Sequence, residues 1–486
     1  MKGDFTRDSF NAAKQFSRVL MQQGRVTLDA DVNEQTAILL RTIRLLARDL
    51  IGPFATPRDG GGFKLMPGGD GGFIISAGRY WVDGILVENP INCGYFDQPN
   101  WPIPADDLLA AEIKSRKQGF FWIYLDVWER LITAVEDPSI REVALGGPDT
   151  AARSKVVWQV RGLPADARSN GLNQRIYGRV SACAAPLAGL PGLSPAWLAA
   201  RVDPGQIVDD PCILPPTAGY RGVENQLYRV EIHQGGATGT ATFKWSRDNG
   251  SRLAAWTGDG GGNELLVSDS RGFAAGAWVE LTNDVLDLQG LPGAMLQLAK
   301  AEPGVLTYDP ASLGTTPAPV WTTDLVNPKV RQWDERRNAR TQLTNGVITV
   351  KEGTAATPLW IDLEDGVQIA FAASGAYRTG DHWLIPARVA TGGVEWPADA
   401  TGKPLFEPPR GIEHHYAPLG FLRLGDNATV ESCRCEFEPA GDCFADVSLG
   451  TGVGALSNPQ LRVAETPTPT PTPVRRRPPR RPSRPS

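Results

Sequence analysis

The sequence contains no apolar run long enough to cross a bilayer, and its first residues lack the apolar core of a secretory signal. These two absences argue against a transmembrane segment. We expect synthesis and assembly in the cytoplasm, with release as part of an extracellular particle left open. Cysteine is also scarce. Six cysteines in 486 residues do not make the dense disulfide framework of small secreted domains, which agrees with synthesis in a reducing compartment.

Positive charge is in short supply outside the C-terminus. The formal net charge is −5, and residues 466–486 hold six arginines and no acid, so residues 1–465 carry −11. An acidic body argues against nucleic acid as the main partner. We therefore expect no specific nucleic-acid partner.

Glycine and proline, in contrast, are abundant. The 53 Gly and 40 Pro are scattered as turn signals between short apolar runs, a pattern typical of many strands and loops. At the C-terminus, the Thr-Pro repeat of 466–473 and the Arg/Pro run of 474–486 cannot form a core. We expect this tail to be disordered and to offer at most a weak contact to an acidic envelope surface.

One long helix is predicted over residues 31–51. Asp29 or Asp31 can accept hydrogen bonds from the free N–H groups of a helix start, and Gly52-Pro53 ends the pattern. Apolar residues recur along this segment at alternating steps of four and three, which places them on one side of a helix. We call this set the stripe, and it consists of Val32, Thr36, Leu39, Ile43, Leu46 and Leu50.

Two interpretations of the stripe are open at this point. It could pack on the protein's own body, or it could contact the same helix in other copies of the chain. Fewer than three full heptads do not separate these interpretations. The six residues are therefore candidate interface residues.

The rest of the chain is predicted to be mainly β, arranged as several small sandwich-like or barrel-like modules. Residues 73–88 alternate around Asp83-Gly84, a strong hairpin signal, and residues 120–130 form a strand with bulky side chains on both faces. A short helix is expected at 194–200. We divide the chain into a helical assembly segment, a first β-rich domain, a Pro/Gly-rich connector, two further β-rich domains and the disordered tail. Their expected bounds, in that order, are 1–60, 61–165, 166–224, 225–340, 341–450 and 451–486.

Four acids in loop-forming surroundings are the candidates for hydrolytic chemistry: Glu129, Glu136, Asp137 and Glu142. With a neighbouring arginine they could serve as general acid, base and substrate clamp. They could equally form salt bridges and turn caps. The second interpretation is favoured, because no nucleophile and base pair accompanies them. We assign no catalytic residue.

A second candidate is metal ligation near the end of the third β-rich domain. Cys433, Cys435 and Cys443, with His414 and His415, offer thiolates and imidazoles that tetrahedral zinc accepts. The spacing Cys-x-Cys-x7-Cys differs from the paired Cys-x2-Cys form, so buried thiols or a disulfide are favoured. We assign no metal and no cofactor.

Six motifs are spread over nearly the whole chain before the tail: residues 2–10, 16–35, 228–233, 243–251, 380–388 and 414–419. Together they resemble a known bacterial family of uncharacterised proteins, found among the genes of phage-tail-like contractile injection systems. The opening segment also resembles the start of certain phage tail and baseplate proteins, in which a similar stretch leads into a helix and then a β-domain with a Val-Asp-Gly hairpin. Those phage proteins are commonly trimeric, so the resemblance favours contact between copies through the stripe. In this chain the stretch is residues 19–35 and the Val-Asp-Gly motif is residues 82–84.

We therefore expect a structural, non-enzymatic component of a phage-tail-like particle. It would be peripheral to the baseplate, as a fibre-like, cage-like or connector protein. Its partners would be other particle subunits and further copies of itself, with a trimer implied by the resemblance. Two alternatives remain: a carbohydrate- or cell-surface-binding module, favoured by 14 Trp, and an envelope-polymer hydrolase that uses the four acids.

Overall fold

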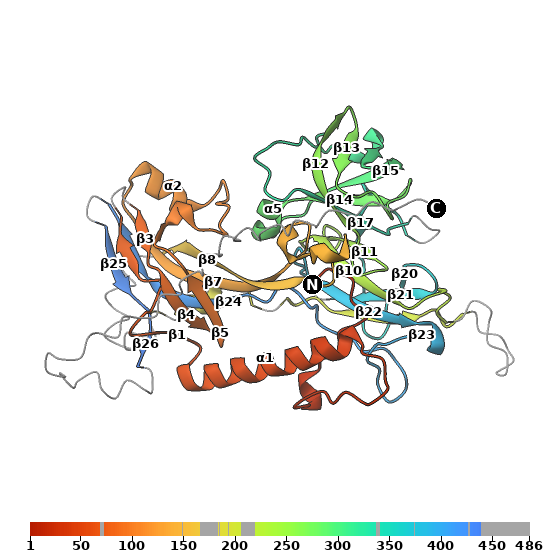
Figure 1. The fold of residues 1–486 in the computed structure, drawn as a ribbon, viewed down its shortest axis with the longest axis horizontal. Coiled ribbons are helices and arrows are strands. Elements are labelled where there is room, and N and C mark those ends of the chain that lie inside the picture. Colours follow the sequence, from red (N-terminus) through yellow and green to blue (C-terminus); the bar gives the residue numbers. More distant parts are fainter. Residues whose placement is uncertain are drawn as a thin grey trace, which may run out of the picture. The chain divides into compact units, whose positions relative to one another are not determined.

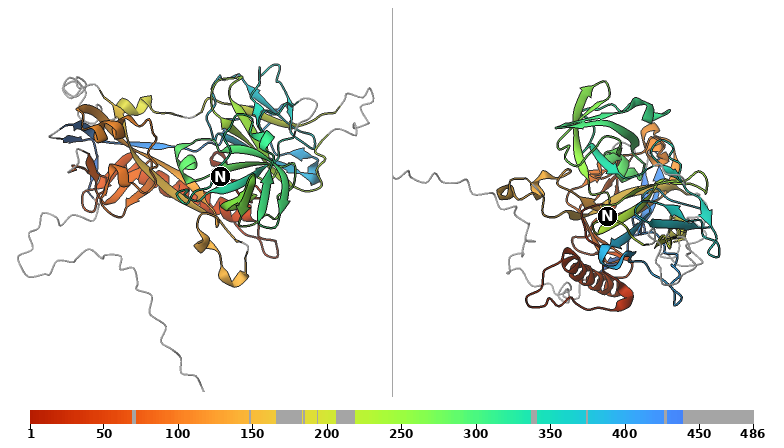
Figure 2. Two further views of the ribbon diagram at one scale, coloured as in Figure 1. Left: turned by 90° about the horizontal axis from the view of Figure 1, so that it is seen from above. Right: turned by 90° about the vertical axis from the view of Figure 1, so that its right-hand side faces the viewer.

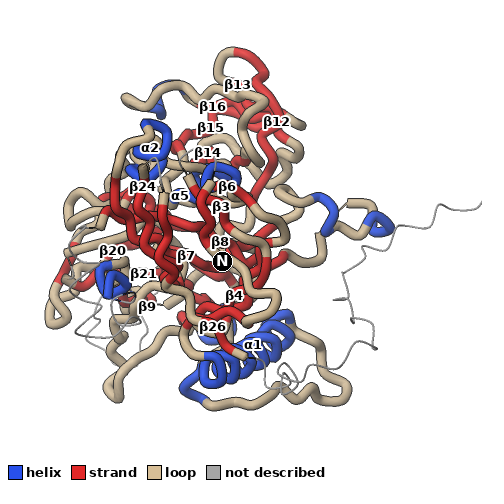
Figure 3. The backbone as a smooth tube through the Cα atoms, turned by 90° about the vertical axis from the view of Figure 1, so that its left-hand side faces the viewer, coloured by secondary structure: helices blue, strands red, loops and turns tan. Residues whose placement is uncertain are grey.

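The structure is mainly β, as the sequence predicts, and consists of several small sheets and a closed barrel. Strands and loops dominate it, as Figure 3 shows. The expected tail, residues 451–486, lies outside the described residues, as does most of the connector 166–224. The computed structural model describes residues 1–68, 72–147, 149–165, 183, 185–192, 194–205, 219–336, 341–373, 375–425 and 428–438.

The predicted helix is confirmed as α1 (Asp29–Ile51), which lies along one side of the sheets (Figure 1). Its N-cap is Leu28, which makes no side-chain capping bond, so the expected capping by aspartate is wrong. Asp29 instead accepts hydrogen bonds from the N–H and hydroxyl of Thr6, at 2.9 and 2.5 Å.

Among the described residues no helix is both long and apolar enough to span a membrane. The other helices are α2 (Leu108–Ser115), α5 (Asp284–Gln289) and the 3-10 turns η1 (Ala12–Lys14), η2 (Tyr95–Asp97), η3 (Pro138–Ile140), η4 (Val143–Leu145), η5 (Ala185–Gly189), η6 (Pro310–Leu313) and η7 (Val389–Thr391).

Three sheets surround the first hydrophobic core. The long strand β7 (Gly119–Ile132) pairs antiparallel with β8 (Arg153–Pro164) on one side and with β24 (His415–Leu424) on the other. The predicted hairpin is confirmed, since β4 (Gly78–Val82) pairs with β5 (Ile85–Asn89) around the expected turn. The remaining strands are β1 (Phe54–Pro57), β2 (Leu65–Pro67), β3 (Phe73–Ile75), β6 (Cys93–Gly94), β25 (Thr429–Ser432) and β26 (Glu436–Phe437).

Strand β7 is buried on both faces, as its sequence predicts. Ile123 and Leu125 point into the first core. On the opposite face Trp122 stacks on Tyr124 with ring centroids 4.9 Å apart, and both side chains are buried. The Trp122 indole donates a hydrogen bond to the Cys183 carbonyl at 3.1 Å. The chain itself therefore covers this strand.

A second core lies between a five-stranded sheet and a smaller sheet. β10 (Gln226–Gln234) pairs antiparallel with β11 (Thr242–Ser246) and with β22 (His382–Arg388). In the smaller sheet β9 (Leu198–Val202) pairs with β21 (Val367–Ala372). The helix expected at 194–200 is therefore wrong, because the apolar residues from Leu198 onward enter this core as an extended strand. The edge strands are β18 (Ile348–Thr349), β19 (Glu352–Gly353), β20 (Ile361–Asp362) and β23 (Gly393–Val394).

Residues 253–333 contain a closed six-stranded barrel, which is one of the two forms, barrel or sandwich, that the sequence leaves open. Its interior is apolar and includes Leu296 and Val330, which are fully buried. A tight turn precedes it, in which Asn249 and Gly250 both have positive φ, 55° and 62°. In barrel order the strands are β12 (Leu253–Gly261), β13 (Glu264–Val267), β16 (Val305–Tyr308), β15 (Ala294–Glu302), β14 (Trp278–Thr282) and β17 (Lys329–Trp333).

The sheets cross the domain boundaries expected from the sequence. β24 and β25 come from the expected domain 341–450, yet they join β7 and β8 of the expected domain 61–165. β22 likewise pairs with β10 of the expected domain 225–340. Residues 1–438 form one compact unit. The expectation of three successive β-domains is therefore corrected, because tertiary contacts rather than sequence order choose the strand partners.

Candidate functional site

The stripe lies on the outer side of α1. One side of this helix faces the sheets and the opposite side faces away from them (Figures 1 and 2). All six stripe residues are exposed: Thr36 is exposed, and the side chains of the five apolar residues are between 52% and 77% exposed. These five are Val32, Leu39, Ile43, Leu46 and Leu50. In the described chain the stripe therefore does not pack on the protein's own body.

The inner side of α1 is held by two buried apolar residues and by close backbone and charge contacts. Ala30 and Ile38 are the buried residues of the helix. A Cβ atom on Gly84, in the hairpin turn, would lie 2.1 Å from the Arg44 carbonyl oxygen, so the turn contacts the helix backbone directly. The Arg44 guanidinium also forms a salt bridge of 2.9 Å with Glu129 of β7. The stripe is left on the outer side.

The segment before α1 also carries exposed apolar side chains. Besides the Thr6–Asp29 contacts, it is attached to the helix by hydrogen bonds from the Ser9 hydroxyl to Glu34 at 2.6 Å and from the Val19 N–H to the Gln35 side chain at 2.8 Å. Exposed apolar patches mark interaction sites, so these side chains are further candidates for an interface. The exposed apolar residues of this segment are Phe16, Leu20, Met21, Val26 and Leu28.

Three of the four candidate hydrolytic acids are engaged in separate local contacts. Glu129 binds Arg44, as described above. Asp137 accepts a hydrogen bond from the Ser139 N–H at 3.1 Å and caps η3. Glu142 accepts from the Ala144 N–H at 3.0 Å and caps η4. These contacts are the salt bridge and turn caps that the sequence favours.

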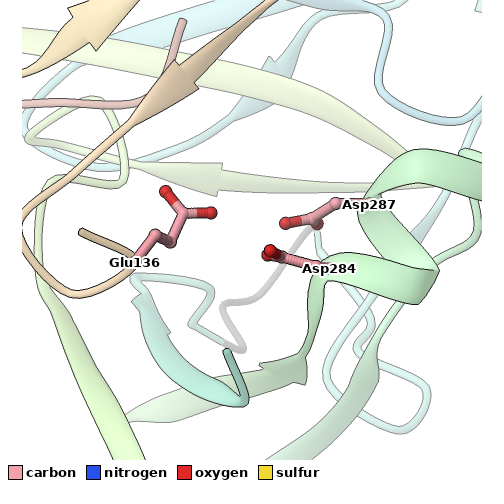
Figure 4. A group of neighbouring side chains, drawn as sticks. All are labelled: Glu136, Asp284 and Asp287. Atoms are coloured by element: carbon pink, nitrogen blue, oxygen red, sulfur yellow. The ribbon is translucent and has the colours of Figure 1, made fainter. Parts of the chain in front are cut away.

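The fourth acid, Glu136, belongs to a cluster that the sequence does not predict. Its carboxylate and those of Asp284 and Asp287 have oxygens within 4.8 Å of one another (Figure 4). The Lys329 ammonium lies 2.5, 3.1 and 2.7 Å from Glu136, Asp284 and Asp287, and the Arg130 guanidinium lies 2.5 Å from Asp284. Burial acts to raise the pKa of Asp284, but Lys329 and Arg130 lower it below the usual value. An ammonium thus occupies the place where three carboxylates would hold a metal ion.

A second buried network links the N-terminal segment, the five-stranded sheet and the barrel. Glu231 of β10 accepts from Arg229 at 2.6 Å and from Lys2 at 2.8 Å. Lys244 of β11 binds Glu280 of β14 at 2.6 Å. Buried charges require such partners, because an unpaired one costs several kcal/mol. The network fixes how these three parts pack.

The cysteines do not form the candidate zinc site. Cys433 is joined to Cys183 in a disulfide, so its thiolate is not available as a ligand. Cys435 is a free thiol of intermediate exposure. Cys443 lies outside the described residues. The structure therefore contains the disulfide that the sequence offers as an alternative, with a partner that the sequence did not identify.

The two candidate histidines are engaged elsewhere. The Nδ1 atom of His414 lies 2.7 Å from a carboxylate oxygen of the buried Asp126, and its ring packs on Trp128 with centroids 4.8 Å apart. The Nδ1 atom of His415 lies 3.0 Å from Asp83 in the hairpin turn. Both imidazoles thus connect β24 to neighbouring strands and turns.

A family model described as a family of unknown function (DUF6519) matches residues 1–189 and 187–465. The chain belongs to this family. A comparison with curated proteins and a comparison with solved structures found no match.

In this DUF6519 protein, sequence reasoning found the stripe but missed most of the charged cluster. Lys329 is 193 residues from Glu136, and Asp284 is 154 residues from Arg130. No motif of fixed spacing joins residues so far apart. The available local signal was Asn283, which caps α5 through the Leu286 N–H and so places two acids in its first turn.

Proposed function

We propose that this protein is a structural, non-enzymatic component of a phage-tail-like contractile injection system, peripheral to its baseplate. It assembles with other copies of itself through the stripe on α1. One observation carries the proposal: large apolar side chains at helix-pairing spacing are exposed on a helix whose opposite side is already packed. The motif resemblance to proteins of these systems supports the particle as its setting.

The spacing of the stripe suits a second helix of the same kind. Thr36, Ile43 and Leu50 take the a positions of a heptad, and Val32, Leu39 and Leu46 take the d positions. Residues that flank such a seam carry charges in many coiled coils, and like charges there repel identical partners. Uncharged residues flank most of this seam, namely Gln35, Leu40, Thr42 and Ala47.

The two alternative functions have less support. Nine of the 14 tryptophans are buried, so most of them serve the cores rather than a sugar-stacking surface. Three of the four candidate acids hold turns or α1, and the fourth is neutralised by Lys329 and Arg130. These engagements favour a building block over a hydrolase.

The test is the oligomeric state of the purified full chain by light scattering and sedimentation. We expect the wild type to be oligomeric and the double variant Leu39→Glu with Leu46→Glu to be monomeric, because two buried charges per copy would oppose helix pairing. Circular dichroism and the melting temperature check that the variant is folded. A wild type that stays monomeric at every soluble concentration would contradict assembly through the stripe.

A matched control introduces the same charges elsewhere. Val143 and Val223 are 89% and 95% exposed, and the double variant Val143→Glu with Val223→Glu should keep the wild-type oligomer. The particle setting is tested separately, by mass spectrometry of purified phage-tail-like particles from a producing bacterium. Particles that lack the chain would rule out this setting and leave self-assembly untouched.

A further inference from the structure

A cavity of about 300 Å³ lies where the β7 sheet, the five-stranded sheet and the barrel meet. At about 30 Å³ for each water in the liquid, this space could hold about ten waters or a small organic molecule. Part of its wall is apolar and part is charged. The apolar lining is Met1, Ile85, Trp128, Leu131 and Ile412.

The cationic side chains that line this cavity have carboxylate partners, with one exception. Arg44 binds Glu129, Lys2 and Arg229 share Glu231, and Lys329 binds Asp287 at 2.7 Å. Arg130 binds Glu136 and Asp284. The exception is Arg331 of β17, which lines the cavity and is 7% exposed.

Arg331 donates a hydrogen bond to the Gly250 carbonyl, and no carboxylate of the described residues forms an ion pair with it. Glu280 stands opposite Arg331 in the β14–β17 register, but its carboxylate is already taken. It accepts hydrogen bonds from Lys244 at 2.6 Å, the Trp333 indole at 3.0 Å and the Gly293 N–H at 3.1 Å. Arginine is rarely buried unless it is paired, so this guanidinium lacks an anion.

The inner network, to which Arg331 belongs, carries an excess of positive charge, which agrees with a bound anion. Four cations gather around two carboxylates there. The other charges at the cavity are those of the outer cluster, the Arg44–Glu129 pair and Glu413. The inner cations are Lys2, Arg229, Lys244 and Arg331, and the inner acids are Glu231 and Glu280. The outer cluster consists of Arg130, Lys329, Glu136, Asp284 and Asp287.

We infer that the cavity binds a small organic monoanion, whose carboxylate or phosphate group pairs with Arg331 and whose apolar part packs against Trp128 and Leu131. Arginine suits this role, because its planar guanidinium binds such oxyanions through two parallel hydrogen bonds. This inference does not depend on assembly through the stripe. It assigns to this chain a ligand site in the interior.

The test is calorimetric titration of the full chain at constant ionic strength. The probes are benzoate, its neutral isostere benzamide, isobutyrate and inorganic phosphate. We expect benzoate to bind at least tenfold more tightly than benzamide, and Arg331→Gln to lose at least tenfold in benzoate affinity. Arg331→Lys keeps the positive charge but cannot form the two parallel hydrogen bonds of a guanidinium. Its benzoate affinity should therefore lie between those of the wild type and Arg331→Gln. This variant also serves as the test if Arg331→Gln does not fold. The affinity for phosphate, compared with that for benzoate, shows whether a free oxyanion or an organic acid is the preferred ligand.

The matched control is Arg252→Gln. Arg252 lies 3.7 Å from Asp248, outside the cavity lining, with its side chain 38% exposed, so this variant should bind benzoate like the wild type. Equal binding of benzoate and benzamide by the wild type would overturn the proposal. So would equal benzoate affinities of the wild type, Arg331→Gln and Arg331→Lys.

Discussion

Glu280 is a buried carboxylate that remains charged. Burial acts to raise its pKa, but the Lys244 ammonium at 2.6 Å and then Lys2 lower the pKa from 4.5 to about 2. Because the folded pKa is depressed, the pair stabilises the fold above about pH 4.5 and loses this contribution as the pH falls toward 2. The acid sensitivity of the fold should therefore depend in part on Lys244.

We expect Lys244→Met to lower the free energy of unfolding at pH 7 by about 3 kcal/mol or more, since it leaves buried carboxylates with fewer partners. The deficit should shrink between pH 4.5 and pH 2, as the wild type protonates Glu280. Urea denaturation across this range measures both effects.

The control for Lys244→Met is Lys300→Met, which removes an exposed pair with Glu302. Exposed pairs contribute little, so this change should stay within about 0.5 kcal/mol. A deficit of Lys244→Met that does not vary with pH would contradict the assigned pairing.

At the scale of elements, the contact between α1 and the β4–β5 hairpin depends on glycine. Gly84 has φ +80°, and a Cβ atom there would lie 2.1 Å from the Arg44 carbonyl oxygen. Both the left-handed backbone and the close approach exclude a side chain. This turn is thus what lets the helix lie directly on the body.

We expect Gly84→Ala to destabilise the protein by about 2 to 4 kcal/mol and to loosen α1, because the helix must move to avoid the added methyl group. Amide hydrogen exchange of residues 29–51 measures the loosening. Gly262→Ala is the matched control, because Gly262 has φ +62° but open space around it. This variant should lose only the stability that a side chain costs in a left-handed backbone, about 1 kcal/mol. Equal losses in the two variants would show that the helix contact contributes nothing.

At the scale of the whole molecule, the disulfide joins parts of the chain that are 250 residues apart. Cys183 follows the first β-rich region, and Cys433 follows β25 directly. Linking distant residues restricts the unfolded chain, and the effect grows with the length of the closed loop. Disulfides persist in oxidising surroundings and are rare where cellular reductants keep thiols reduced.

We expect the double variant Cys183→Ser with Cys433→Ser to lose about 2 to 5 kcal/mol of stability. Dithiothreitol should lower the melting temperature of the wild type and leave that of the double variant unchanged. Cys435→Ser, which removes a free thiol, should behave like the wild type. A wild-type melting temperature that does not respond to dithiothreitol would refute the bond.

The sequence by itself left open whether the β-rich modules are barrels or sandwiches, but it determined the local elements, namely α1, the β4–β5 hairpin and β7. Their signals lie within a few residues, because helix and strand periodicity and Asp-Gly turns act over short distances. It also identified the stripe residues, but not the side of the helix on which the body lies.

The tertiary structure decided the rest. It chose β24 as the partner of β7, although about 300 residues separate them, since the alternation of a strand does not encode its neighbour. It also brought Lys329 next to Glu136, and Cys183 next to Cys433, although each pair is far apart in the sequence. It also left the stripe exposed, because Ala30 and the Gly84 turn allow α1 to pack closely through its opposite side.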